Sequence, residues 1–161
     1  MEGTIGVLCL LIVLSAYFSA TETAFSSLNR IRVKNMASEG NKKAKLALKL
    51  CDKFDELLTT ILVGNNIVNI LSSSLATALF VEIFPKNGVA ISTVVVTAVV
   101  LIFGEISPKS MAKESPESFA MFSAPFINIL RCVLKPITFL FSLLKKGIKA
   151  IFHLKNNDGI T

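Results

Sequence analysis

Three long apolar segments without charged residues dominate the hydrophobic pattern of the chain. They run from Gly3 to Thr21, from Leu57 to Val81 and from Asn87 to Gly104. A helix that crosses a bilayer needs about 20 predominantly apolar residues, each rising 1.5 Å. The third segment is rich in Val and Ile, but lipid cannot satisfy the backbone of an open strand edge, so a helix is expected there too. We therefore predict three membrane-spanning helices, over about residues 4–28, 57–84 and 89–107.

The polar segment between the first two spans carries eight basic residues. They are Arg30, Arg32, Lys34, Lys42, Lys43, Lys45, Lys49 and Lys53. Basic residues concentrate in cytoplasmic loops, so we expect the N-terminus outside and this segment inside. Within it, Leu46, Leu50 and Phe54 recur every four residues. This spacing predicts an amphipathic juxtamembrane helix over about 40–55.

The segment over about 117–154 is long enough to cross the membrane, but it also carries a polar stripe. The stripe consists of Asn128, Arg131, Lys135, Thr138 and Ser142, at helical spacing. A crossing would place the lysines that follow outside, against the charge rule. We therefore expect an interfacial helix, bent at Pro125 and Pro136, that forms a belt on the cytoplasmic side. Its basic residues would face anionic lipids of the inner leaflet, and they are Arg131, Lys135, Lys145, Lys146 and Lys149. A fourth span is the alternative.

Composition supports an all-α membrane protein and excludes several other classes. Hydrophobic residues make up 52% of the chain and charged residues 17%, whereas soluble proteins average about 45–50% and 25%. Three scattered cysteines and one histidine provide no disulfide framework, zinc site or histidine-based active site. We expect no enzyme activity and no nucleic-acid partner. Residues 1–154 are expected to form one transmembrane domain, and 155–161 the start of a linker.

A polar cluster in the third span suggests a cation site. Glu105 follows Gly104 within the apolar segment, and Pro108 lies four residues after Gly104. Proline has no N–H, so the Gly104 carbonyl loses its helical partner at a predicted helix break. An ionisable residue in a span suggests a functional site. A proline kink with Glu105 paired to Lys109 is the alternative.

Polar stripes on the first two spans could complete this site. The first stripe consists of Ser15, Ser19, Glu22 and Ser26, and the second span carries Asn65, Asn66, Asn69, Ser72, Ser73 and Ser74. Hydroxyl, amide and carboxylate oxygens suit Mg²⁺, Ca²⁺ or Na⁺. Hydrogen bonding between packed helices explains the stripes equally well. For Glu22 we expect a pairing with Arg30 or Lys109 rather than a ligand role.

Three motifs within these stripes resemble those of the CorB/CorC and CNNM magnesium transporter family. They are FSATETA at Phe18–Ala24, VGNNIVN at Val63–Asn69 and FGEISPK at Phe103–Lys109. Each motif is short, but their order matches that of the family, and together they cover nearly the whole chain as its transmembrane domain.

The resemblance implies a homodimer in which each protomer holds a dehydrated Mg²⁺ between three helices, exported in exchange for Na⁺. It also implies cytoplasmic CBS domains beyond this chain. The second motif leaves open which of its side chains faces the ion. The candidate ligands are Ser15, Ser19, Asn65, Asn66, Asn69, Ser73, the Gly104 carbonyl and Glu105.

Two functions remain in competition. A transporter would use the oxygen ligands of three helices to replace the tightly held water of Mg²⁺. A non-transporting membrane anchor or Mg²⁺ sensor would use the same polar stripes for helix packing.

Overall fold

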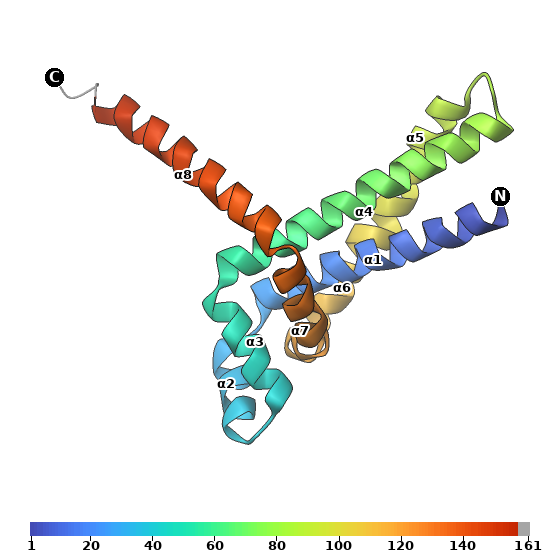
Figure 1. Ribbon diagram of the computed structural model, residues 1–161. Helices are drawn as coiled ribbons and strands as arrows, with labels where there is room; N and C mark the ends of the chain where they lie inside the picture. The colour runs from blue at the N-terminus through green and yellow to red at the C-terminus, as the bar shows by residue number, and fades with distance from the viewer. Residues whose placement is uncertain (158–161) are drawn as a thin grey trace.

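A computed structural model describes residues 1–157, with side chains described to residue 153, and every regular element in that range is helical. Three helical runs are long and apolar enough to cross a membrane, which confirms the predicted fold class. The first two are α1 (Glu2–Ser27) and α4 (Phe54–Ile83). The third joins α5 (Gly88–Val99), the π-helix η1 (Val100–Ile106) and α6 (Ser107–Glu114) into one run. The three runs lie side by side in one arm of the molecule (Figure 1).

The basic segment forms a hairpin of two helices, α2 (Arg30–Ser38) and α3 (Lys42–Asp52), below the spans in Figure 1. The side chain of Asn29 caps α2 by accepting the N–H groups of Ile31 and Arg32, and Asn41 caps α3 in the same way. Gly40, at φ 99°, makes the turn between them. Only the second helix was predicted, because α2 has nine residues and its apolar face consists of just Val33, Met36 and Ala37.

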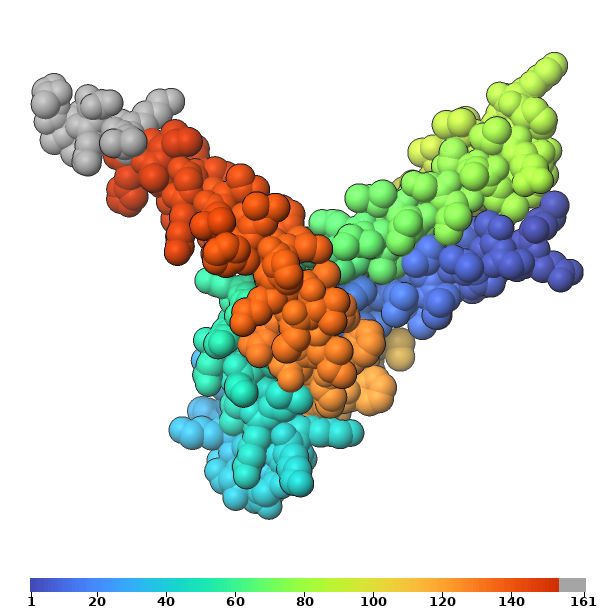
Figure 2. All heavy atoms as spheres, viewed as in Figure 1, coloured from blue at the N-terminus to red at the C-terminus, as the bar shows by residue number. Residues whose placement is uncertain are grey.

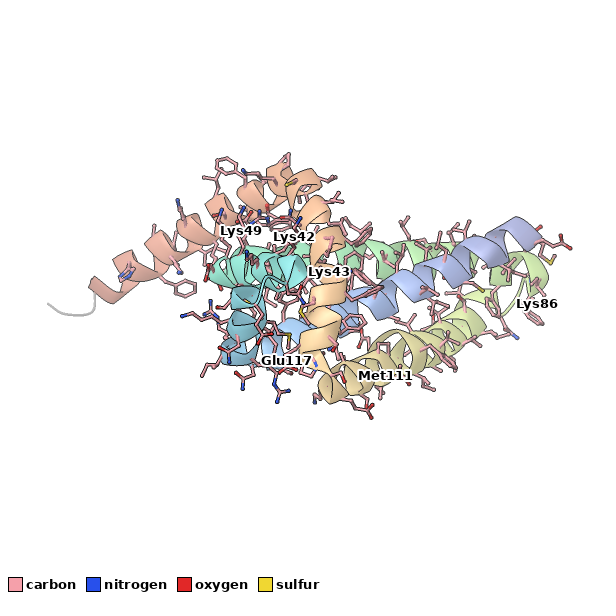
Figure 3. The ribbon with its side chains drawn as sticks, turned by 90° about the horizontal axis from the view of Figure 1, so that it is seen from below. Lys42, Lys43, Lys49, Lys86, Met111 and Glu117 are labelled. Atoms are coloured by element: carbon pink, nitrogen blue, oxygen red, sulfur yellow. The ribbon has the colours of Figure 1, made fainter. Side chains whose placement is uncertain are left out.

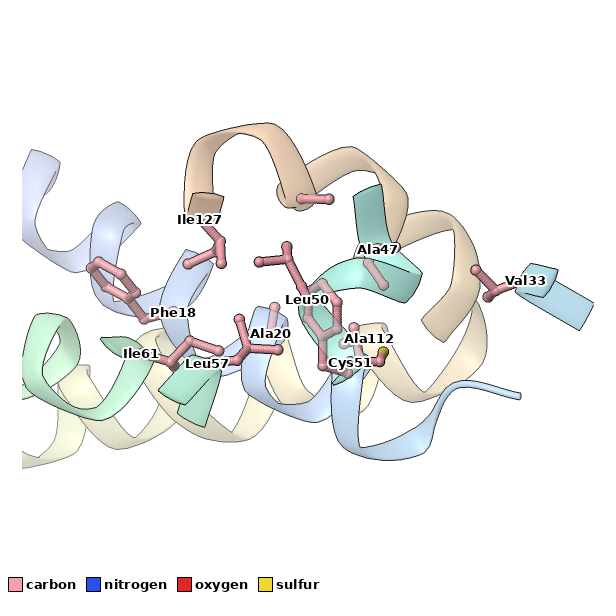
Figure 4. Close-up of a cluster of buried hydrophobic side chains, with 14 of the residues drawn as sticks. Phe18, Ala20, Val33, Ala47, Leu50, Cys51, Leu57, Ile61, Ala112 and Ile127 are labelled. Atoms are coloured by element: carbon pink, nitrogen blue, oxygen red, sulfur yellow. The ribbon is translucent and has the colours of Figure 1, made fainter. Parts of the chain in front are cut away.

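The main core lies where the spans meet the hairpin. Leu50, Leu57, Ile61 and Ile127 are almost fully buried there and come from α3, α4 and α7. Alanines fill the close contacts around them, including Ala24, Ala44, Ala47, Ala112, Ala120 and Ala124 (Figure 4). Burial raises the pKa of the Cys51 thiol in this core. The packing ties the hairpin rigidly to the ends of the spans.

The C-terminal segment forms two helices, α7 (Pro116–Val133) and α8 (Lys135–Asn157), with a bend of 71° between them. Pro136 lies directly after the bend, whereas α7 continues through Pro125. The pair is therefore no single straight span. α7 lies across the ends of α1 and α4 that adjoin the hairpin, and α8 projects away from the bundle (Figures 1 and 2). Part of the predicted linker, residues 155–157, is helical in α8, and residues 158–161 lie outside the described residues.

Candidate functional site

Ser15 is the centre of the polar contacts between the spans. Its side chain is 1% exposed. Its hydroxyl lies 2.8 Å from the Asn69 amide oxygen and 3.2 Å from that of Asn65, in donor geometry to both. A serine hydroxyl has one proton, so it satisfies one of these oxygens at a time. The other amide oxygen remains available to a ligand between α1 and α4.

The third span reaches the same point through its π-helix. Gly104 is buried in η1, and a Cβ atom added to it would lie 3.0 Å from the Ser15 hydroxyl oxygen. The structure thus brings together predicted residues from all three spans. π-helical turns are rare in proteins overall, and those that occur are often found at functional sites.

The predicted helix break takes a different form. The Ser107 N–H bonds to the Ile102 carbonyl, five residues earlier, and the helix continues beyond Pro108 to Glu114. Pro108 lacks the N–H that an α-helix would require at this position. The wider π-helical turn directly before it keeps the chain helical, so the break predicted at Pro108 is a change of helix type.

Ser19 lies one turn after Ser15 on α1. It is 1% exposed, and its hydroxyl has no hydrogen-bond partner among the described residues. An unsatisfied buried hydroxyl costs about 1–3 kcal/mol. A bound cation that accepts the oxygen as a ligand would remove that cost. The buried, unpartnered Ser19 hydroxyl therefore indicates that a ligand could bind between the spans at this point.

Glu105 follows Gly104 in η1 and is half-buried. Over residues 1–153, the ion pairs within 4 Å are Arg30–Asp52, at 2.8 Å, and Arg32–Glu117, at 3.9 Å. The predicted alternative pairing of Glu105 with Lys109 is therefore not formed. The pairing expected for Glu22 is also wrong, because Arg30 extends along the hairpin to Asp52 instead. Glu105 is therefore in no ion pair with the described residues.

Two of the predicted ligands lie elsewhere on α4. Asn66 and Ser73 are exposed, whereas Asn65 and Asn69 are half-buried and contact Ser15. Residues one position apart on a helix point about 100° apart, so one rotation of α4 cannot aim all four side chains at one ion. The polar junction in direct contact therefore comprises Ser15, Asn65, Asn69 and Gly104. Ser19 lies one turn further along α1, and Glu105 follows Gly104 in the chain.

The predicted lipid-facing basic residues fall into two groups. All four lysines are exposed. Lys135 and Lys145 also line a 450 Å³ cavity together with Asp55 and Glu56 at the start of α4. Arg131 donates a hydrogen bond to the Asn128 amide oxygen at 3.2 Å, and its other terminal nitrogen is buried.

Glu117, which the sequence analysis missed, fixes the belt to the hairpin. Its carboxylate accepts the Asn29 N–H at 3.2 Å and lies 3.9 Å from Arg32. An acidic residue directly after Pro116, at the start of a helix, was the available signal. This contact sets the position of α7 against the end of α1.

Gly64 was also missed, and it sets how closely α1 and α4 approach. A Cβ atom at this position would lie 2.7 Å from the end of the Phe18 ring, which is itself 4% exposed. Gly64→Ala is therefore expected to cost about 1–3 kcal/mol of stability through overpacking. Thermal unfolding in detergent would measure the loss. A matched control is Gly6→Ala, where the added Cβ meets nothing within 4 Å, and equal effects of the two would contradict the close approach.

Gly104→Ala is expected to act on the junction more than on stability. The added methyl group would stand 3.0 Å from the Ser15 oxygen, so the Ser15 side chain must shift by a few tenths of an ångström. A Mg²⁺ site at this junction, which is proposed below, would lose about tenfold or more in affinity, because Mg²⁺ requires near-ideal octahedral geometry. Calorimetric titration would test this, and unchanged affinity would place the ion elsewhere.

The oxygen atoms of the junction are ligands of the kind that hard cations prefer. Over residues 1–153 no three side chains of His, Cys, Asp and Glu form a cluster able to hold a metal. The junction instead offers hydroxyl, amide and carbonyl oxygens with one carboxylate. Such donors select Mg²⁺, Ca²⁺ or Na⁺ over zinc or copper. The junction contains no nucleophile with an adjacent base.

Comparison with known proteins gives a consistent assignment. A family model described as "CNNM: Cyclin M transmembrane N-terminal domain" matches residues 6–160. A UPF0053 protein of Haemophilus influenzae is 40% identical over 149 residues, which cover 92% of this chain and 36% of that protein. The UPF0053 inner membrane protein YfjD of Escherichia coli is 39% identical over 144 residues, covering 89% of this chain and 34% of that protein.

A more distant relative carries a named activity. The polyamine export protein of Salmonella typhimurium is 25% identical over 176 residues, covering the whole of this chain and 39% of that protein. The chain thus spans little more than a third of the length of these relatives.

Proposed function

Since the chain belongs to the cyclin M (CNNM) family of transmembrane domains, we propose that it is the membrane part of a Mg²⁺ transporter that exchanges Mg²⁺ for Na⁺. The observation that carries the proposal is the meeting of Ser15, Asn65, Asn69 and Gly104 from three spans, beside the buried and unpartnered hydroxyl of Ser19. Packing alone accounts for the hydrogen bonds between the spans but not for that hydroxyl.

The proposed transport step replaces the water shell of Mg²⁺ by protein oxygens. Magnesium gives up its water reluctantly, so a fixed set of oxygens offsets the cost only when their positions are set before the ion arrives. Buried α1–α4 packing and the π-helix hold these oxygens in place. Glu105 contributes the one carboxylate of this set, so the occupied site keeps a net positive charge. That charge favours release once the helices open or Na⁺ competes.

The setting of this step follows the charge pattern and the resemblance. The N-terminus lies outside, and the basic hairpin, α7 and α8 lie on the cytoplasmic side in contact with anionic lipids. The chain acts as a homodimer. The resemblance extends the proposal to cytoplasmic CBS domains that work together with this transmembrane domain.

A polyamine is the second candidate cargo, because one relative bears that name. A polyamine is a long cation whose ammonium groups donate hydrogen bonds, so it needs several acceptors spread along an extended path. The junction is compact and buried and includes one carboxylate. This difference favours a small, dehydrated ion over a polyamine.

Two measurements test the proposed function. Calorimetric titration of the purified chain with MgCl₂ should give saturable binding that Na⁺ weakens, while spermidine gives none. Proteoliposomes that contain a Mg²⁺-sensitive dye should show Mg²⁺ movement driven by a Na⁺ gradient. Binding without movement would support the anchor or sensor, and binding of spermidine without Mg²⁺ would support the polyamine.

A further inference from the structure

Tyr17 joins the first span to α7 by a hydrogen bond. Its hydroxyl donates to the Ser123 carbonyl at 3.0 Å. Ser123 is fully buried, and its own hydroxyl donates to the Phe119 carbonyl at 2.9 Å within α7. The acceptor of the Tyr17 hydroxyl is therefore held in place by the packing and the internal bonds of α7.

Two aromatic side chains of α7 hold the Tyr17 ring beside this hydrogen bond. The ring packs edge-on against Phe126 at a centroid distance of 5.1 Å and at a tilt against Phe119 at 6.4 Å. Phe119, Ser123 and Phe126 are spaced by four and three residues, so they share one face of α7. The two rings and the carbonyl together fix the orientation of the tyrosine side chain.

α7 is itself fixed at its start. The Glu117 carboxylate accepts the Asn29 N–H at 3.2 Å and lies 3.9 Å from an Arg32 nitrogen. Figure 3 shows Glu117 at the end of α7 that adjoins the hairpin, and α7 lying across α1. α7 therefore supports α1 through contacts that do not involve the polar junction.

Tyr17 lies on the opposite side of α1 from Ser15 and Ser19. Successive residues of a helix are turned by about 100°, and Tyr17 is two residues from each serine, so about 200° separates it from Ser15. The two serines are four residues apart and lie within about 40° of one another. α1 thus contacts α7 with one side and carries both serines on the other.

The bond of Tyr17 differs from the other polar contacts of α1. Among the described residues, the side chains of α1 that donate hydrogen bonds to other helices are Ser15 and Tyr17. An ion at the junction would coordinate the oxygens that Ser15 and its asparagine partners use, so those bonds rearrange when it binds or leaves. The Tyr17 bond lies outside the junction and keeps its direction throughout.

A small rotation of α1 would misplace both serines. Cα atoms lie about 2.3 Å from the helix axis, so a rotation of roughly 20° moves them by about 0.8 Å and the side-chain oxygens by more. A binding site needs its ligands within about 0.5 Å and 10–20° of their working positions. The site therefore requires that the rotation of α1 be held, and the Tyr17 bond holds it from outside the site.

We propose that Tyr17 is a positioning residue of the ion site. Its hydrogen bond to Ser123 sets the rotation of α1, and so keeps Ser15 beside Gly104 and the asparagines of α4, with Ser19 one turn along the same face. The inference rests on the proposed function, because it concerns the same site. It makes the position of α7 a determinant of the affinity for the ion.

Tyr17→Phe tests the proposal, since it keeps the ring and removes the hydroxyl. We expect Mg²⁺ affinity, measured by calorimetric titration in detergent, to fall about three- to tenfold, the range that one hydrogen bond allows. Thr60→Val is the matched control, because Thr60 is also fully buried and its hydroxyl donates within α4, to the Glu56 carbonyl. It should leave the affinity unchanged. Unchanged affinity in Tyr17→Phe, or an equal loss in Thr60→Val, would overturn the proposal.

A second measurement follows the rotation of α1 without an ion. A Cβ atom on Gly104 would lie 3.6 Å from the Ser15 Cβ atom, and disulfides join Cβ atoms about 3.5–4.5 Å apart. Ser15→Cys combined with Gly104→Cys, in a chain whose 3 native cysteines are replaced by alanine, should therefore form a disulfide on oxidation. Tyr17→Phe in this chain should slow disulfide formation several-fold, and Thr60→Val should not.

The two measurements separate this inference from the proposed function. An unchanged rate of disulfide formation in Tyr17→Phe would overturn the positioning role, whether or not an ion binds. A slower rate, together with no Mg²⁺ binding to the wild-type chain, would support the control of α1 rotation by Tyr17 and contradict the proposed function alone.

Discussion

Glu105→Gln is expected to weaken Mg²⁺ binding by about a hundredfold or more. Glu105 lies half-buried in η1, directly after the glycine that touches Ser15, and pairs with no described cation. Removing one partner of a fully buried charge pair costs about 3–5 kcal/mol. Glu105 is half-buried, so the expected hundredfold loss lies just below that range. The glutamine keeps the shape and the oxygen of the side chain, so the loss reports the charge. Calorimetric titration in detergent measures it.

Glu82→Gln provides the matched control. Glu82 is an exposed carboxylate near the C-terminal end of α4, more than three helical turns beyond Asn69. The same change of charge there should leave the binding isotherm unaltered. An equal loss in both variants would indicate a general electrostatic effect, and no loss in Glu105→Gln would remove this residue from the site.

Leu57→Ala is expected to cost about 2–5 kcal/mol of stability, the usual range for a leucine truncated in a packed core. Leu57 is 0% exposed and lies where α4 meets the hairpin and α7. The lost methyl groups leave a cavity, and the small alanine side chains in this core cannot move in to fill it. Because this core holds the belt to the spans, we expect α7 and α8 to loosen first, with faster hydrogen exchange there.

Leu62→Ala is the comparison for this effect, since Leu62 is 59% exposed one and a half turns further along α4. Its change should shift the thermal unfolding midpoint in detergent by much less. Similar shifts for both leucines would mean that hydrophobicity of the span, and not packing at the junction, determines stability.

The spans were predictable because lipid imposes a simple rule. A segment that crosses the hydrocarbon must be about 20 residues long and must hydrogen-bond its own backbone groups, which a helix does. All three apolar segments meet both conditions. The shorter elements were harder to predict. The apolar face of α2 is limited to Val33, Met36 and Ala37. The helix forms because Asn29 caps its start and this short face packs into the core. Of the two prolines expected to bend the last segment, only Pro136 lies at the bend.

The polar junction was predictable in kind but not in detail. Helical spacing placed Ser15 and Ser19 on one face of α1, and the structure buries both. The rotation of α4 was not available from spacing, because Asn66 and Ser73 lie on a helical face as regular as that of Asn65 and Asn69. The close approach of Gly64 to Phe18 sets that rotation. The π-helix was visible only as a proline after a glycine and an acidic residue.

The most direct test of the central claim is to locate the ion. Manganese prefers the same oxygen ligands as magnesium and scatters X-rays strongly enough to be identified. Crystals of the chain grown with Mn²⁺ should give an anomalous peak within about 2.0–2.5 Å of the Ser19 hydroxyl oxygen and close to Glu105. Addition of excess Mg²⁺ should remove the peak. A peak beside Asp55 and Glu56 instead, or no peak between the three spans, would contradict the account.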